Sequence, residues 1–367
     1  MSSLQMASIE EFESVLEPII TDAGRDAVAQ CWLVKLPANR PPWTPSGVEL
    51  SAGDQISVFS AGRASLVGAP NIWVGSHIAL WMRIGLEGEI FRAPGRSHTF
   101  TVEAGGQLYL SSLFLSDWAD RHGGLATNPR AYERVAGTLA VLVLRWRVEP
   151  LAGLDRLAAD GSAGAAIMRA EADRLRNPVT TPAGWHYLWS TGDSGIFDSG
   201  RDAAGEPIIR CRVRDDGAIL QRPVQLKFDP AAKLRWSWKI DALPSAQRED
   251  AVATHDYLSV AVEFDNGQDL TYLWSAAMTP ESSFRCPISR WNGRETHLVV
   301  RSGAARLGEW IGEERELWND YRRAIGTPPA TIVAVWLIGV SLFAHTDGYC
   351  EYSALELLSD GRTISLI

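Results

Sequence analysis

Short segments in which apolar and polar residues alternate recur along most of the chain, and this period of two constrains the fold more than any other feature. In "KLRWSWKID" (233–241), Leu234, Trp236, Trp238 and Ile240 share one side of an extended strand, because successive side chains point to opposite faces. A row that contains Leu and Ile is typical of a protein core, and a solvated sugar-stacking platform would rarely contain them. We therefore expect this tryptophan pair to be buried.

Similar segments form two groups, separated by a stretch of different character. The first group runs from "DQISVFSAG" to "TLAVLVLRWRVE", and the second from "PIIRCRVR" to "EYSALELL". Between them, the Ala-, Leu- and Arg-rich residues 149–176 predict helix, which Asn177-Pro178 ends because proline disfavours helix in the residue before it. Residues 8–30 and 308–325 also carry apolar residues at helical spacing.

These patterns predict a mostly β protein: two β-sandwich, jelly-roll-like domains joined by a helical connector, with one helix packed on the second sandwich. A length of 367 residues agrees with about two domains. The expected parts are an N-terminal helix and Pro-rich connector (1–46), a first sandwich (47–148), a helical linker (149–181) and a second sandwich (182–367).

Charge and hydropathy exclude several classes of partner. The net charge is −9 and the arginines are scattered, so the surface repels phosphate backbones and nucleic acid is not an expected partner. The longest apolar run, Ile332 to Ala344, is too short to span a bilayer and predicts a buried strand. The N-terminus is acidic where an export signal is basic, so we expect a cytoplasmic protein without a membrane partner. The oligomeric state stays open.

The four cysteines predict neither a disulfide framework nor a metal site. They stand far apart at positions 31, 211, 286 and 350, with no Cys-x-x-Cys pair, as expected for reduced, buried thiols. No P-loop, Gly-x-Gly-x-x-Gly, His-Glu-x-x-His or Gly-x-Ser-x-Gly motif occurs. The sequence thus predicts no cofactor and no metal.

One segment presents aromatic residues that a core does not require. If "NIWVGSHIALWMRIG" (71–85) is extended, its apolar row from Ile72 to Ile84 fills the core face, and Trp73, His77 and Trp81 point the other way. Large aromatics opposite a complete core row need a partner, which is a ligand, the other domain or a second subunit. These three residues are ligand-binding candidates.

The loop "SDWADRHGG" (116–124) supplies the remaining ligand-binding candidates. Asp117, Trp118 and Asp120 follow a strand end, and loops on a rigid sandwich often carry binding residues. The alternative is a solvated turn.

Two His–Asp regions are candidates for acid–base chemistry. In "THDYLS", His255 and Asp256 stand at the start of a strand, and His345 lies in the turn "SLFAHTDGY". Histidine titrates near neutrality and serves as a general acid or base. Neighbours on a strand face opposite ways, so His255 and Asp256 need not cooperate, whereas the two regions form a shared site if their turns converge.

Two resemblances rest on longer stretches. The segments "LRWSWKID", "HDYLSVAVEF", "LTYLWS", "HLVVRSGAARLGEW" and "ERELWNDYRRAIGTPP" show that residues 207–358 resemble a bacterial domain-of-unknown-function family, number three-oh-four-seven. That resemblance implies a jelly-roll-like sandwich without established chemistry. The turn after its last long strand departs from the family's Asp/Asn-rich pattern.

The second resemblance covers residues 47–148. "TPSGVELSAGDQISVFSAGR", "LWMRIG" and "GGQLYLSSLFLSD" resemble the galactophilic lectins of the PA-IL type. Those lectins bind calcium and sugar through an Asp/Asn-rich loop, which is longer here and lacks the adjacent Asp-Asn. Asp117 and Asp120 offer too few oxygens for a hard cation, so the resemblance implies the fold without the metal-dependent sugar site.

Two classes of function remain. The first is a binding protein that takes a saccharide or other small organic ligand into an aromatic-lined pocket. The alternative is a cofactor-independent enzyme of secondary metabolism, a cyclase, isomerase or lyase, with a pocket at the domain interface and proton transfer by His255, Asp256 or His345.

Overall fold

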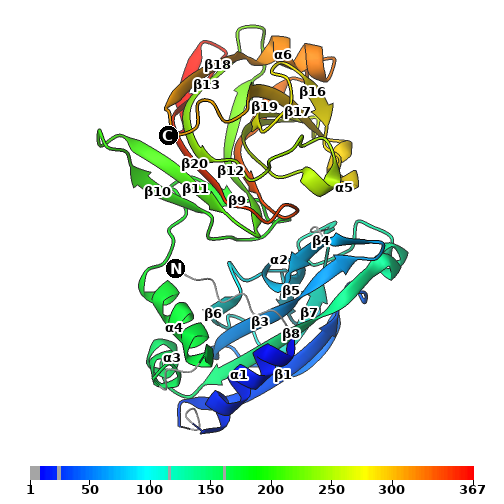
Figure 1. Ribbon diagram of the computed structural model, residues 1–367, viewed down its shortest axis with the longest axis vertical. Coiled ribbons are helices and arrows are strands. Elements are labelled where there is room, and N and C mark those ends of the chain that lie inside the picture. The colour runs from blue at the N-terminus through cyan, green and yellow to red at the C-terminus, as the bar shows by residue number, and fades with distance from the viewer. Residues whose placement is uncertain (1–8, 23–25, 115–116, 160–162) are drawn as a thin grey trace. The chain divides into compact units, whose positions relative to one another are not determined.

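The computed structural model describes residues 9–22, 26–114, 117–159 and 163–367 (Figure 1). The strands of these described residues form four β-sheets, and the chain divides into two compact units, residues 1–179 and 180–367. The expected mostly β class is confirmed. Along the described part of the chain, no helix is both long and apolar enough to cross a membrane.

The first unit is built on two antiparallel sheets. One has the order β1-β8-β3-β4, with β6 also paired to β3, and the other has the order β2-β7-β5. The strands are β1 (Val28–Pro37), β2 (Thr44–Leu50), β3 (Gln55–Leu66), β4 (Ala69–Gly75), β5 (Leu80–Ile84), β6 (Ser97–Thr101), β7 (Gly106–Ser112) and β8 (Val135–Trp146). The helical segments are α1 (Ile9–Asp22), α2 (Ser76–Ala79), η1 (Pro129–Arg134), α3 (Pro150–Leu157) and α4 (Ala163–Arg176).

Three of these helices share an apolar cluster with the larger sheet. Phe12 of α1, Leu154 of α3 and Met168 of α4 are buried together with Phe59 of β3 and Leu142 of β8. The helices expected over 149–176 are therefore present as α3 and α4, and they contribute to the core of the first unit.

The helix expected over residues 8–30 is shorter in the structure. Helix α1 ends at Asp22, residues 23–25 lie outside the described part, and Val28 already begins β1. Strand β1 pairs with β8 along its length, for example Val34 with Val141. This pairing outweighs a local helical pattern, because strand formation depends on neighbours that are distant in sequence.

The second unit contains two facing sheets. One has the order β10-β11-β20-β13-β18, with β21 paired to β20, and the other has the order β16-β17-β15-β14-β19-β12-β9. The parallel pair β15/β17 is accompanied by antiparallel pairs such as β14/β15 and β14/β19. The strands are β9 (His186–Tyr187), β10 (Phe197–Arg201), β11 (Pro207–Val213), β12 (Gly217–Lys227), β13 (Lys233–Ala242), β14 (Tyr257–Phe264), β15 (Asp269–Ser275), β16 (Ser283–Arg285), β17 (Glu295–Ser302), β18 (Ile311–Glu316), β19 (Thr331–Val340), β20 (Gly348–Ser359) and β21 (Arg362–Ser365). Its helical segments are η2 (Val252–Thr254), α5 (Ser289–Asn292) and α6 (Leu317–Ala324).

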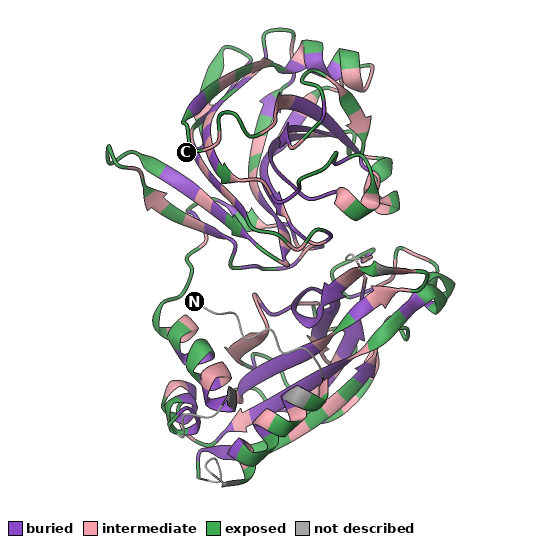
Figure 2. Cartoon of the chain, viewed as in Figure 1, coloured by how far each residue is buried: buried purple, intermediate pink, exposed green. Residues whose placement is uncertain are grey.

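The core of this unit lies between its two sheets, whose strands carry many buried positions (Figure 2). Trp236 and Trp238 of β13 are 1% and 0% exposed and pack edge-on, with ring centroids 5.5 Å apart. The prediction that this pair is buried is confirmed. Strand β19 confirms the buried strand expected from Ile332 onward, although it ends at Val340.

The segment 308–325, for which a helix is expected, contains a strand followed by a shorter helix. Residues 311–316 form β18 at the edge of the sheet, and only Leu317–Ala324 form helix α6. The acidic residues of β18 face basic neighbours across β13, since Glu314 lies 2.7 Å from Lys233 and 2.5 Å from Arg235. Cross-strand charge pairs of this kind stabilise a strand that a helical pattern does not anticipate.

Candidate functional site

The candidate site lies on the outer face of the seven-stranded sheet in the second unit. Alternate residues of its strands face away from the main core and form a separate apolar cluster that includes Tyr257, Leu273 and Trp336. Phe284 of β16 and Trp291 of α5 pack on this cluster. The segment that carries β16 and α5 thus covers part of the outer face and brings polar side chains onto it.

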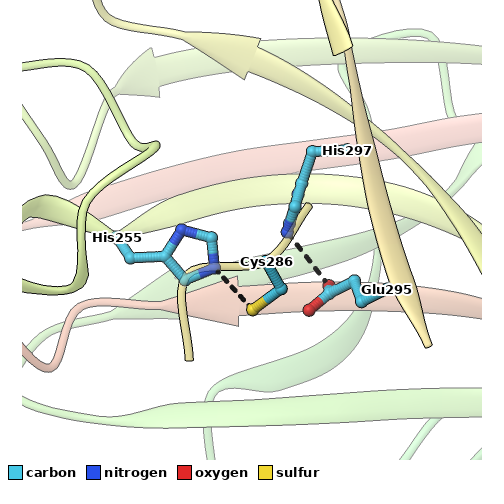
Figure 3. Close-up of side chains that lie close together, drawn as sticks. All are labelled: His255, Cys286, Glu295 and His297. Atoms are coloured by element: carbon cyan, nitrogen blue, oxygen red, sulfur yellow. Dashed lines mark hydrogen bonds and ion pairs between the residues drawn. The ribbon is translucent and has the colours of Figure 1, made fainter. Parts of the chain in front are cut away.

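Four side chains of metal-ligating type meet under this cover: His255, Cys286, Glu295 and His297 (Figure 3). One ligand atom from each lies within 4.8 Å of those of the other three. Cys286 Sγ is 3.3 Å from His255 Nε2, and Glu295 Oε1 is 3.5 Å from His297 Nε2. All four side chains are buried, with exposed fractions of 3% or less.

Local structure explains how these residues converge. Glu295 and His297 are two apart on β17, so strand alternation places both on the outer face. His255 lies two residues before the start of β14, and Cys286 follows the short strand β16 that pairs with β17. The sequence analysis missed Cys286, Glu295 and His297. The one local signal was the pair of ionisable residues on one face of an otherwise apolar strand.

Neighbouring groups hold the members of this cluster in place. The Nδ1 atom of His255 lies 2.5 Å from the carbonyl oxygen of Glu249, which directs Nε2 toward Cys286. The Tyr257 hydroxyl donates to Glu295 Oε1 at 2.9 Å. The ring of His297 stacks on Phe284 with centroids 4.7 Å apart, yet neither of its nitrogens has a hydrogen-bond partner among the described residues.

The Cys286–His255 contact is not a nucleophilic pair. An activated cysteine needs a depressed pKa and access to substrate. Here burial raises the pKa of Cys286, and burial together with His297 lowers the pKa of His255 to about 3. Both groups are neutral at physiological pH, and Cys286 is 1% exposed. Burial also acts to raise the pKa of Glu295, but the neighbouring His297 and His255 outweigh it and lower that pKa.

A small cavity lies at the same face, because Trp291, which lines it, packs on the apolar cluster there. Its volume is about 240 Å³, and it is lined by Ser190, Arg290, Trp291 and Arg294. The Arg294 guanidinium lies over Trp291, 5.0 Å from the ring centroid, and donates to Glu263 Oε1 at 2.9 Å. These contacts fix the position of one guanidinium group at the cavity wall.

The predicted aromatic ligand contacts lie in the first unit. The segment 71–85 is not continuously extended, because helix α2 stands between β4 and β5. This helical turn breaks the alternation, so the expectation that Trp81 lies opposite the core row is wrong. Trp81 and Trp118 are both fully buried and pack edge-on with centroids 5.6 Å apart, and Trp43 stacks on Trp118.

The other two candidates of that segment belong to other elements than Trp81. Trp73, on β4, is half-buried beneath the Arg63 guanidinium, which lies 5.5 Å from its ring centroid. His77 is a buried residue of α2, and its carbonyl oxygen accepts from Arg92 Nη1 at 3.2 Å.

The two aspartates of the loop have different environments. Asp120 is exposed, and its Oδ1 accepts from the backbone N–H groups of His122 and Gly124 at 2.8 and 3.2 Å. These bonds lower the pKa of Asp120. Asp117 is half-buried and accepts from the Tyr132 hydroxyl at 3.4 Å. Asp120 thus organises its own turn, while Asp117 contacts η1.

The predicted acid–base residues divide between two positions in the second unit. His255 points into the buried cluster, whereas Asp256 points away and accepts from the backbone N–H groups of Leu342, Phe343 and Ala344. His345 is the next residue after Ala344, and its Nδ1 atom lies 2.9 Å from Asp215 Oδ1. The structure therefore brings Asp256 to the turn that carries His345 and separates both from the ring of His255.

Comparison with protein-family models agrees with the resemblance seen in the sequence for residues 207–358. Residues 199–356 match the model of DUF3047, a protein family of unknown function. The chain is also similar to the N-terminal domain of EclA, a PllA-like lectin, with 21% identity over 33% of this chain and 98% of that one, and a TM-score of 0.26. No curated protein matches the chain.

Two solved glycosidase structures are also similar to the chain at 8% identity. One is the xyloglucanase domain of NopAA from Sinorhizobium fredii in complex with cellobiose, covering 49% of this chain and 95% of that one, with a TM-score of 0.29. The other is endoglucanase 3 of family GH12 from Trichoderma harzianum, covering 49% of this chain and 100% of that one, with a TM-score of 0.25.

Proposed function

We propose that the second unit is a binding module for a small saccharide acid, taken into the cavity lined by Ser190, Arg290, Trp291 and Arg294. The observation that carries this proposal is the cavity's lining, in which two guanidinium groups and one indole ring occur together. Guanidinium groups bind carboxylates through paired hydrogen bonds. An indole face beside polar groups suits a sugar ring, whose one side is largely C–H and whose edge carries hydroxyls.

The size and charge of the cavity favour a single sugar unit that bears one negative charge. At about 240 Å³ it is smaller than the roughly 300–1,000 Å³ of pockets for drug-sized ligands. Glu263 binds Arg294 from one side, so the second charge of a phosphate group would meet a nearby carboxylate. A monoanionic carboxylate avoids part of that repulsion.

Isothermal titration calorimetry on the full chain tests this proposal with galacturonate, galactose and galactose 6-phosphate. Galacturonate should bind most tightly, and Arg290→Gln should weaken it about tenfold or more, because a charge-assisted contact is lost. The matched control is Arg306→Gln, which alters an exposed arginine paired with Glu309. Equal affinities for galacturonate and galactose, or an unchanged affinity in Arg290→Gln, would contradict the proposal.

A further inference from the structure

We propose that His255, Cys286, Glu295 and His297 form a zinc site that fastens together three segments of the second unit. The ligands would be one thiolate sulfur, one carboxylate oxygen and two imidazole nitrogens, each a donor type that zinc accepts in tetrahedral sites. The proposal concerns the stability of this unit and is independent of the saccharide-acid cavity.

The spacing of the ligand atoms matches a tetrahedron. Zinc bonds of about 2.0–2.3 Å place neighbouring ligand atoms roughly 3.3–3.8 Å apart. The Cys286–His255 and Glu295–His297 separations, 3.3 and 3.5 Å, already fall in this range. The longest separation within the set is no more than 4.8 Å, so a small contraction completes the coordination.

The charge balance suits a buried site. A zinc dication, the Cys286 thiolate, the Glu295 carboxylate and two neutral imidazoles sum to zero. Binding converts the Cys286 thiol to a thiolate by forming a sulfur–zinc bond and releasing one proton to solvent. A buried carboxylate is costly in a protein interior unless it is paired; Glu295 has the Tyr257 hydroxyl at 2.9 Å and His297 Nε2 at 3.5 Å as neighbours, and zinc would add a full positive charge beside it.

The ion also accounts for polar atoms that the protein itself leaves unsatisfied. Neither ring nitrogen of His297 forms a hydrogen bond among the described residues, although the ring is fully buried and Nε2 lies 3.5 Å from Glu295 Oε1. Unsatisfied groups of this kind are rare in native proteins and often mark an ion or water. A bond from His297 to zinc satisfies one of the two nitrogens.

The groups around the cluster resemble those that orient metal ligands. Metal-binding histidines usually donate their other N–H to a carbonyl or carboxylate, which fixes the ring and its tautomer. His255 does this through Nδ1 to the Glu249 carbonyl, and the Glu295 carboxylate is held by accepting from the Tyr257 hydroxyl. Four protein ligands leave no open coordination position, and all four are buried, so the site is structural and not catalytic.

A zinc ion at this site would connect three segments of the second unit. His255 precedes β14, Cys286 lies between β16 and α5, and Glu295 with His297 belongs to β17. A zinc ion would fix the segment carrying β16 and α5 onto the sheet. Zinc binds the folded unit and thereby raises its stability by mass action.

The test is the metal content of the full chain after purification, measured by inductively coupled plasma mass spectrometry. We expect about one zinc per chain, near zero in Cys286→Ser, and an unchanged value in Cys31→Ser, whose cysteine is exposed and belongs to the first unit. Loss of zinc in Cys31→Ser with retention in Cys286→Ser would overturn the assignment.

The wild-type chain gives a second test if Cys286→Ser does not fold. Chelation should lower Tm by about 5 °C or more, and added zinc should restore it. Cobalt added to the chelated chain should produce a thiolate-to-cobalt charge-transfer band and the visible bands of tetrahedral geometry. A chain that keeps its Tm on chelation and shows no such bands contains no zinc site here.

Discussion

The sulfur of Cys286 lies 3.3 Å from Nε2 of His255, and both side chains are only 1% exposed. A cysteine–histidine contact at a protein surface suggests nucleophilic chemistry. The same contact without access to substrate, completed by Glu295 and His297, fits a set of metal ligands instead. Burial is therefore the property that distinguishes the two roles at this position.

Removal of Trp236 should damage the core of the second unit. Trp236→Ala replaces a 1% exposed indole by a methyl group, and such substitutions cost about 3–5 kcal/mol in unfolding free energy. Trp310→Ala removes the same atoms at a 38% exposed position and should cost less than about 1 kcal/mol. Urea unfolding followed by circular dichroism compares the two. Similar losses in both variants would contradict the core assignment.

Asp256 should act as an anchor for the turn that carries His345. Its carboxylate accepts three backbone N–H groups from residues 342–344, and an asparagine side chain offers one acceptor oxygen in place of two. We expect Asp256→Asn to lower the unfolding free energy of the second unit by about 2 kcal/mol. Asp347→Asn, at a side chain that is 69% exposed, is the matched control. If the two substitutions have equal effects, the carboxylate does not anchor this turn.

Glu171 should hold helix α4 against strand β6. Its buried carboxylate accepts from Ser97 Oγ at 2.7 Å, from Thr99 Oγ1 at 2.6 Å and from both Nε and Nη2 of Arg174. Glu171→Gln weakens these charge-assisted bonds and should cost about 1–3 kcal/mol. Thermal unfolding of the first unit measures this loss against Glu103→Gln, which alters an exposed glutamate. A Tm equal to that of the control would exclude the role.

The first unit should lose stability in mild acid through His98. Burial lowers the pKa of His98 from 6.5 to about 4, and the charge of Arg174 adds to this effect against the opposing charge of Glu171. Between these pH values the unfolded chain binds a proton that the folded unit does not, so stability falls as pH decreases from 6.5 to 4. The full effect is at most roughly 3 kcal/mol.

The His98 effect is measured as Tm of the first unit against pH. His98→Gln lacks the titrating ring, so its Tm should change less than that of the wild type between pH 6.5 and 4. Parallel curves for the two chains would show that another group controls the acid sensitivity.

The alternation of apolar and polar residues predicted burial correctly where the whole apolar row lies on one strand. Trp236 and Trp238 were correctly placed in the core, because their row is apolar over its full length. The same reasoning failed at residues 71–85, since four residues of helix after Gly75 change which side chains share a face. Helical spacing, in turn, gave the wrong element at β18, because the stabilising partners of this strand, Lys233 and Arg235, lie far away in sequence.

For a related reason, local sequence patterns could not predict the buried cluster. His255, Cys286 and Glu295 belong to different segments, and only the pairing of β16 with β17 and the packing against β14 bring them together. The spacing of cysteines excluded a Cys-x-x-Cys site but carried no information on a mixed set of ligands. Of the four residues, only His255 was identified as functional, and it was assigned to proton transfer.

Anomalous diffraction from crystals of the full chain, recorded on both sides of the zinc absorption edge, tests the central claim most directly. We predict one strong peak that appears above the edge, within about 2.0–2.3 Å of His255 Nε2, Cys286 Sγ, a Glu295 oxygen and a His297 nitrogen. A chain purified without chelators that shows no peak among these four side chains would contradict the zinc site.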